Sequence, residues 1–221
     1  MTVHFHPNVS PESCPALVLN ADFRPLSYYP LSLWSWQDAI KAVFLDRVEH
    51  LVKLSSGHAY PPQFIETRLR FSPFIKDVMV LGDATRPWVG ALINIDMAVT
   101  SRWAEERRIA FSTFTDLSQR SEVRQLMQGE IRRINKLLPE GSRVVRFANF
   151  PKELDPDEGE LTRTRKLRRE FLEVRYRALI EGLYAGAADI ACEIAVTYQD
   201  GRQGVLRATV VATDIDQTHT P

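Results

Sequence analysis

Cysteine and long apolar runs are both scarce in this sequence, and each absence excludes a class of protein. Only two of its 221 residues are cysteine, Cys14 and Cys192, and two such residues far apart build neither a disulfide framework nor a zinc site by themselves. No apolar run approaches the ~20 residues that a membrane-spanning helix needs, so we expect no membrane span. The first residues also lack the basic and then apolar pattern of a secretory signal. We therefore expect a cytoplasmic protein in a reducing compartment.

An excess of charge of one sign is missing as well. The sequence has 28 Lys and Arg residues against 28 Asp and Glu residues, for a formal net charge of zero. Overall electrostatic attraction to nucleic acid is therefore excluded, and only a local basic patch could bind it. What the sequence does have is 44% hydrophobic residues, which is enough to bury a sizeable core.

Hydrophobic periodicity predicts both strands and helices. The clearest helix lies within 118–138, where apolar residues recur at spacings of three and four. A second long helix is expected from about Arg165 to Tyr184, and Asp200-Gly201 predicts the turn of a C-terminal hairpin. Because the elements do not follow a strict βαβ order, we predict an α+β fold. We expect a small mixed sheet flanked by helices, preceded by an N-terminal strand–helix arm and followed by a β-hairpin.

A series of short sequence blocks between Asp46 and Gly186 carries the most information about function. The blocks are Asp46-Arg47, Leu51 to Gly57, Pro61 to Glu66, Ser72 to Asp77, Val80 to Asp83, Ala91 to Asp96, Ile134-Asn135, Lys152 to Asp155 and Gly159 to Arg169. In this order and spacing they resemble the small C-terminal domain of adenylate-forming acyl-CoA ligases. The similarity is to the long-chain fatty acid–CoA ligase branch of that superfamily.

This resemblance implies a lid-like domain that works with a large N-terminal domain. In the family the large domain binds ATP and the fatty acid, and the small domain closes over it, supplies a lysine for adenylation, and then rotates to admit CoA. Lys166 matches that catalytic lysine, and a flexible ammonium suits the negative charge that collects when a carboxylate attacks a phosphate. Taken locally, Lys166 belongs to a basic run of the kind that is most often a solvated surface.

Three further residues are candidates through the same resemblance. Arg47 matches an arginine near the nucleotide ribose, although it also reads as an ordinary surface residue ending a helix. His50 occupies the hinge position, where the family usually has aspartate or lysine. Gly57 lies in the loop on the CoA side, and its simplest role is to permit a tight turn. We expect Glu66 to cap or pair within the small domain, and we predict no metal site.

The parts of the family that belong to the large domain are not found in this sequence. It has no Ser/Thr/Gly-rich phosphate loop and no ribose-binding aspartate motif. We therefore expect this chain to bind no cofactor alone and to be inactive alone, because proximity catalysis needs all the reactants in one site. A complete ligase would use ATP, Mg and CoA, with a separate large domain as the partner of this chain and acyl-adenylate or CoA bound only in the combined enzyme.

The first segment has a resemblance of its own. Pro15 to Ser27, followed by Trp34 to Arg47, is similar to the N-terminal lead-in of a bacterial HNH endonuclease family, but the His-Asn-His core does not follow. Both resemblances include Phe44 to Val48. We therefore hypothesise a chimeric chain with an N-terminal arm over 1–48, a ligase lid-like domain over 49–186 and a hairpin with tail over 187–221.

Two alternatives to a ligase part stay open. The chain could be a nucleic-acid-associated HNH-family remnant that binds through Arg163 to Arg177. It could instead be a non-catalytic interaction module, in which the hairpin from Ile194 to Val211 pairs with the sheet edge of a partner.

Overall fold

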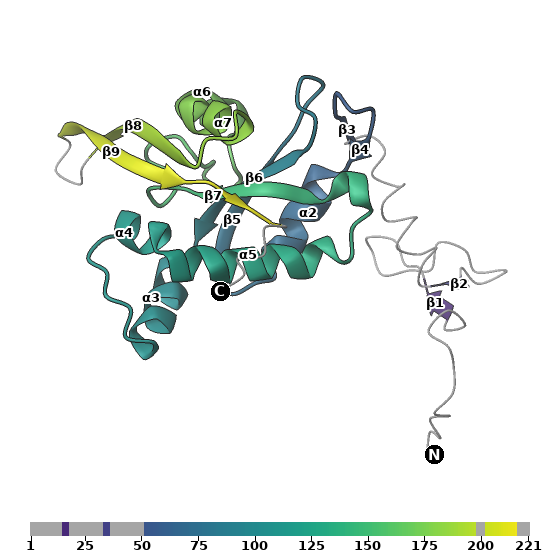
Figure 1. The fold of residues 1–221 in the computed structure, drawn as a ribbon, viewed down its shortest axis with the longest axis horizontal. Coiled ribbons are helices and arrows are strands. Elements are labelled where there is room, and N and C mark those ends of the chain that lie inside the picture. Colours follow the sequence, from purple (N-terminus) through teal and green to yellow (C-terminus); the bar gives the residue numbers. More distant parts are fainter. Residues whose placement is uncertain (1–14, 18–32, 36–50, 198–201, 216–221) are drawn as a thin grey trace, which may run out of the picture. The chain divides into compact units, whose positions relative to one another are not determined.

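The computed structural model divides the chain into two compact units, Met1–Leu51 and Val52–Pro221. In the first unit, strand β1 (Pro15–Leu17) pairs antiparallel with β2 (Leu33–Ser35). The remainder of the predicted arm, including its helix, lies outside the described residues. The structure describes residues 15–17, 33–35, 51–197 and 202–215 (Figure 1).

The second unit is built around a four-stranded mixed sheet with the order β10-β7-β6-β5. Strand β5 (Ile75–Leu81) runs antiparallel to β6 (Val89–Ile95), which runs parallel to β7 (Val144–Asn149). The short β10 (Thr213–Asp214) closes the other edge of β7 in antiparallel register. Every residue of β6 is buried, as expected for a central strand covered on both faces. The predicted small mixed sheet is confirmed.

Helices between β6 and β7 make the long crossover that parallel neighbours require. They are α3 (Met97–Glu106), α4 (Phe114–Gln119) and α5 (Ser121–Asn135), followed by the 3-10 turn η3 (Glu140–Ser142). Figure 1 shows α5 along one side of the sheet, opposite α6 and α7. The helix predicted within 118–138 is therefore confirmed as α5, whose apolar face is buried at Val123, Met127, Ile131 and Ile134.

The first elements of the second unit form a small turn and a helix. Strands β3 (Val52–Lys53) and β4 (Ala59–Tyr60) pair antiparallel and are followed by α2 (Pro62–Leu69). Pro62 stands in the first turn of α2, where the missing proline N–H is harmless.

The second predicted long helix is in fact two shorter ones, α6 (Arg169–Arg175) and α7 (Arg177–Tyr184). Tyr176 between them has φ −103° and ψ 21°. Its buried ring meets Phe150 edge-on with centroids 4.8 Å apart. The expected start near Arg165 is also wrong, because this residue has a φ of +58°, which a right-handed helix cannot contain.

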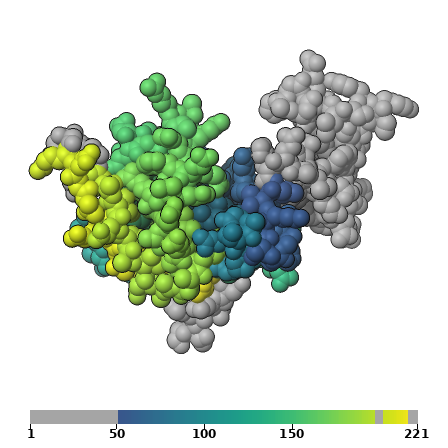
Figure 2. Space-filling model, turned by 90° about the horizontal axis from the view of Figure 1, so that it is seen from above, coloured from purple at the N-terminus to yellow at the C-terminus, as the bar shows by residue number. Residues whose placement is uncertain are grey.

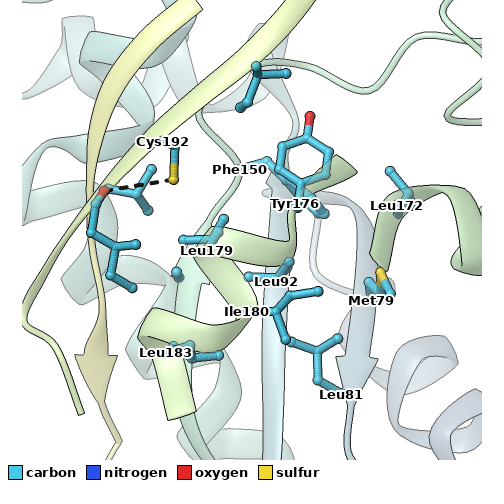
Figure 3. Close-up of a cluster of buried hydrophobic side chains, with 14 of the residues drawn as sticks. Met79, Leu81, Leu92, Phe150, Leu172, Tyr176, Leu179, Ile180, Leu183 and Cys192 are labelled. Atoms are coloured by element: carbon cyan, nitrogen blue, oxygen red, sulfur yellow. Dashed lines mark hydrogen bonds between the residues drawn. The ribbon is translucent and has the colours of Figure 1, made fainter. Parts of the chain in front are cut away.

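A hydrophobic cluster fills the space between the sheet and α6 and α7 (Figure 3). It extends to the hairpin of β8 (Asp189–Thr197) and β9 (Gln203–Val211), which confirms the predicted C-terminal hairpin. Side chains on one face of the hairpin, such as Ile194, join this cluster. Over the described ranges, no helix combines the length and apolarity that crossing a bilayer would demand.

Candidate functional site

A tight turn holds Lys166 near its end. Leu161 and Leu167 form an antiparallel bridge, and between them the Thr162 amide donates to the Lys166 carbonyl over 2.8 Å. The Lys166 amide donates in return to the Thr162 hydroxyl over 3.0 Å. Arg165 reverses the chain with its positive φ and donates its amide to the Thr162 carbonyl over 2.9 Å. Lys166 therefore lies in a braced turn before α6, and not in the first turn of a helix.

The side chain of Lys166 faces solvent. In the part of the chain that the structure describes, its ammonium makes no hydrogen bond or ion pair, and the flanking Arg163 and Arg165 are exposed as well. The green segment that contains this turn projects from the second unit in the view of Figure 2. The turn thus presents a cation that is not neutralised by the neighbouring chain.

Directly before the turn, Glu160 is completely buried. One carboxylate oxygen accepts from Lys152 Nζ over 2.6 Å and from the Asp155 amide over 2.9 Å. The other accepts from the Tyr176 hydroxyl over 2.8 Å and lies 3.3 Å from Arg175 Nε. A buried carboxylate needs such partners because desolvation of an unpaired charge is very costly.

Glu158 completes what we call the buried charge cluster, which consists of Lys152, Glu158, Glu160 and Arg175. Glu158 lies 2.8 Å from Lys152 Nζ and 2.7 Å from Arg175, so two cations balance two carboxylates. Burial raises the pKa of the Tyr176 hydroxyl above its ordinary value, and the adjacent Glu160 charge raises it further. Tyr176 therefore stays a neutral donor to Glu160.

A second attachment lies just after the turn, at the first residue of α6. Arg169 donates to the Val80 carbonyl over 2.9 Å and forms an ion pair with Glu66, which also accepts from the Val80 amide over 2.9 Å. Burial raises the pKa of Glu66, against the opposing effect of Arg169. The expected pairing of Glu66 within the domain is confirmed, and it ties α6 to β5.

A cleft of about 460 Å³ opens beside this attachment, between the end of β5 and helices α6 and α7. Its lining mixes both signs of charge and includes Asp83, Arg86, Glu173 and Arg177. The Arg86 guanidinium lies 4.4 Å from the centre of the Tyr184 ring. Lys166 is not among the lining residues.

Of the other three site candidates from the sequence, only Gly57 lies within the described residues. Gly57 lies in the β3–β4 turn with a φ of +85°, and a Cβ at this position would meet nothing within 4 Å. Its backbone accords with the tight-turn role, while its place on the CoA side stays a prediction. Arg47 and His50 lie outside the described residues. Among the residues that are described, no group of three or more His, Cys, Asp or Glu could hold a metal ion.

Comparison with known proteins identifies the family to which this chain belongs. A sequence model described as "AMP-binding enzyme C-terminal domain" matches residues 49–188. The chain belongs to this family. A second model, described as "HNH endonuclease-associated, N-terminal domain", matches residues 16–68, so both predicted resemblances are supported and the two matches overlap over 49–68.

Curated relatives of this domain are fatty acid–CoA ligases. The chain is 27% identical over 139 residues to "Long-chain-fatty-acid--CoA ligase FadD15" of Mycobacterium tuberculosis, covering 62% of this chain and 23% of that protein. It is 27% identical over 143 residues to "Long-chain-fatty-acid--CoA ligase 1" of Homo sapiens, covering 64% of this chain and 20% of the relative. The chain therefore spans only about a fifth to a quarter of the length of these relatives.

A solved structure shows the same fold. The A-PCP didomain of carboxylic acid reductase from Segniliparus rugosus, in complex with AMP, superposes with a TM-score of 0.50 at 18% identity. The match covers 62% of this chain and 17% of that one. At this identity the likeness concerns the fold alone.

Sequence reasoning missed the two attachments that hold the turn. Glu160 belongs to one of the blocks of the family resemblance, and Arg169 follows closely on the basic run of Lys166, so charge alone predicts a solvated side chain for it. The partners of Glu160 extend to Tyr176, and Arg169 pairs with Glu66 from 103 residues earlier. The sequence offers one local signal, a glutamate directly beside an apolar residue. This pattern is too common to predict that Glu160 is buried.

Proposed function

We propose that residues 49–188 act as the closing small domain of an adenylate-forming fatty acid–CoA ligase, with Lys166 as the catalytic cation. The chain contributes this domain to a reaction centre whose other half is a separate large domain. On this proposal the chain is inactive alone, because the reactants are held together only in the combined enzyme.

The observation that carries the proposal is the placement of Lys166. Its ammonium is exposed in a turn whose backbone is fixed by the Leu161–Leu167 bridge. A cation that is exposed on a rigid support can enter the site of another domain without first breaking a local ion pair. Membership of the family suggests which reaction such a cation would serve.

In that reaction an oxygen of the fatty acid carboxylate attacks the α-phosphorus of ATP and pyrophosphate leaves, giving acyl-adenylate. Both reacting groups are anionic, so the Lys166 ammonium offsets charge that builds up in the transition state. The CoA thiol, losing its proton, then attacks the acyl carbon and AMP leaves, giving the thioester. Rotation of the small domain between the two steps would withdraw Lys166, with His50 at the hinge and Gly57 brought to the CoA side.

The substrates of this proposal are ATP, a fatty acid and CoA, and Arg47 is proposed to lie near the nucleotide ribose. Mg is proposed to be held by the large domain and the phosphates of ATP, since the described residues of this chain show no cluster of ligands for it. No step of the proposal depends on a metal bound to this chain.

The test combines the full chain with the large domain of a long-chain fatty acid–CoA ligase whose own C-terminal domain has been removed. We expect addition of the chain to restore pyrophosphate release from ATP in the presence of fatty acid. We expect Lys166→Ala to reduce this rate by about 10²-fold, the scale of losing one preorganised electrostatic group. Thioester formation from added acyl-adenylate and CoA should be unaffected, because Lys166 serves the first step only.

Lys136→Ala is the matched control, since Lys136 is also exposed but ends α5. This variant should restore adenylation as well as the unchanged chain does. Equal rates with and without the chain, or equal loss in both lysine variants, would show that the proposed function is wrong.

A second candidate function is favoured by the HNH-associated match over 16–68. In this alternative the chain associates with nucleic acid, and it predicts DNA binding that weakens steeply with salt.

The chimeric origin is a related proposal, supported by the overlap of the two family matches over 49–68. Reading genomic DNA without interruption across the codons for 40–70 tests it, and a break in the reads there would contradict a real fusion.

A further inference from the structure

Glu160 lies directly before the turn and makes several contacts, none of them with Lys166. It is fully buried and combines three hydrogen bonds with a fourth, ionic contact to Arg175. Lys152 and Arg175 bring two positive charges to it. Tyr176, the residue between α6 and α7, donates a hydrogen bond to it. Moving this carboxylate away would deprive Lys152 and Arg175 of one of the two carboxylates with which each of them pairs.

The main chain of Glu160 is bound as firmly as its side chain. Its amide donates to the Asp155 carbonyl over 3.2 Å, and its carbonyl accepts from the Arg168 amide over 3.0 Å. The second of these bonds closes the base of the turn, one step outside the Leu161–Leu167 bridge. Fixing Glu160 therefore fixes both strands that enter and leave the turn.

We propose that Glu160 is a positioning residue: its buried carboxylate holds the base of the 161–167 turn and so sets the direction in which Lys166 is presented. The proposal rests on the proposed function of Lys166, but its structural part can be tested on this chain alone. The carboxylate acts through the backbone and not on substrate, because it is enclosed by its own domain.

The negative charge of Glu160 is the property that matters. With an amide in its place, Lys152 and Arg175 would share only Glu158, and the cluster would hold two cations against one carboxylate. Since the amide has nearly the same size, Glu160→Gln changes the charge and leaves the packing volume almost unchanged. Local opening of the turn then becomes easier while the apolar core is kept.

Trypsin measures this opening directly, because it cleaves after Arg163, Arg165 and Lys166. The experiment digests the full chain under native conditions and follows each cleavage site by mass spectrometry. For Glu160→Gln we expect initial cleavage within 163–166 to rise by about tenfold or more, as local opening becomes more frequent. Cleavage after Arg133 on α5 should stay unchanged, which separates release of the turn from general unfolding.

Glu193→Gln is the matched control, because Glu193 pairs with Arg207 on the exposed face of the hairpin. It should leave both sites unaffected. An unchanged rate at 163–166 in Glu160→Gln would overturn the proposal, and so would an equal rise at Arg133. If Glu160→Gln does not fold, Tyr176→Phe removes one bond to the same carboxylate, and a selective rise at 163–166 is again required.

The combined assay with the large domain then links the turn to chemistry. We expect Glu160→Gln to lower the kcat of adenylation and to leave the KM for ATP and the thioester step nearly unchanged. A change in KM or in thioester formation equal to that in kcat would overturn the positioning role. If the unchanged chain fails to restore adenylation, the proposed function is wrong while the trypsin result still decides what Glu160 does to the turn.

Discussion

Two glutamates of the same domain, each beside an arginine, lie in opposite surroundings. Glu160 has no exposed surface and meets Lys152, Arg175 and Tyr176. Glu193 pairs with Arg207 at 2.9 Å, but 66% of its side chain is exposed. The buried pair must be complete because an unpaired charge there is desolvated, whereas water replaces either partner on the hairpin. The ion pair of Glu160 therefore helps to hold its surroundings in place, whereas that of Glu193 adds little to a hairpin that its own backbone pairing already holds.

The largest effect is expected from breaking the buried charge cluster. Lys152→Ala removes a cation that pairs with both Glu158 and Glu160, and we expect the free energy of unfolding to fall by about 3–5 kcal/mol. Urea unfolding followed by circular dichroism measures the change. Lys136→Ala is the exposed control, and a loss as small as the control's would contradict the difference between the two regions.

A smaller effect is expected from removing one neutral donor to the same cluster. Tyr176→Phe keeps the ring against Phe150 and deletes the hydroxyl bonded to Glu160. A hydrogen bond to a charged group contributes about 1.5–3 kcal/mol, so we expect a loss of unfolding free energy in that range. Tyr184→Phe, whose hydroxyl donates to the neutral Trp88 carbonyl over 3.3 Å, should cost less.

Alkaline pH should lower the stability of the protein through Cys192, which lies on the buried face of the hairpin. Burial raises the pKa of the Cys192 thiol from 9.0 to about 11. Between these values the unfolded chain loses the thiol proton and the folded chain keeps it, so stability is complete below pH 9 and falls as pH rises towards 11. The raised pKa values of Tyr60, Tyr176 and Tyr184 act in the same direction above pH 10.

Thermal unfolding at pH 8 to 10 measures this dependence. Cys192→Ala should show a shallower fall in melting temperature over this range than the unchanged chain. An identical slope in both proteins would mean that the thiol does not titrate differently in the folded and unfolded states.

The smallest effect belongs to the outer face of the hairpin. Glu193→Gln should change the free energy of unfolding by less than about 1 kcal/mol, and added salt should reduce even that difference. Urea unfolding at low and high salt checks it. A loss similar to that of Lys152→Ala would erase the contrast between exposed and buried pairs.

The sequence predicts features that neighbouring residues determine, but it does not predict features that depend on contacts between residues far apart in the chain. The apolar spacing of α5 and the alternating residues of the C-terminal hairpin are local signals, and α5 and the paired strands β8 and β9 are both present. The turn predicted at Asp200-Gly201 lies outside the described residues. The break at Tyr176 is not local, because it accompanies contacts with Phe150 and Glu160. A run of helix-compatible residues therefore predicted one helix where tertiary contacts produce two.

The candidate site followed the same rule. The ordered blocks of the family single out Lys166 as the candidate lysine, which stays a prediction, but they do not predict its surroundings. The local basic pattern placed it at a helix start, whereas the Leu161–Leu167 bridge places it in a turn. Charge alone did not distinguish Arg169, bound to Glu66 across the domain, from its solvated neighbours.

The left-handed backbone of Arg165 has a consequence for how this loop tolerates change. The left-handed conformation costs an L-residue about 1–2 kcal/mol relative to glycine, yet an arginine occupies the position with a φ of +58°. Glycine would relax the chain at that point but would remove a cation next to Lys166. β-Branched residues would suffer most, because their bulk adjoins the reversed peptide. At this residue the domain therefore keeps a cation beside Lys166 in a backbone conformation that glycine would adopt more easily.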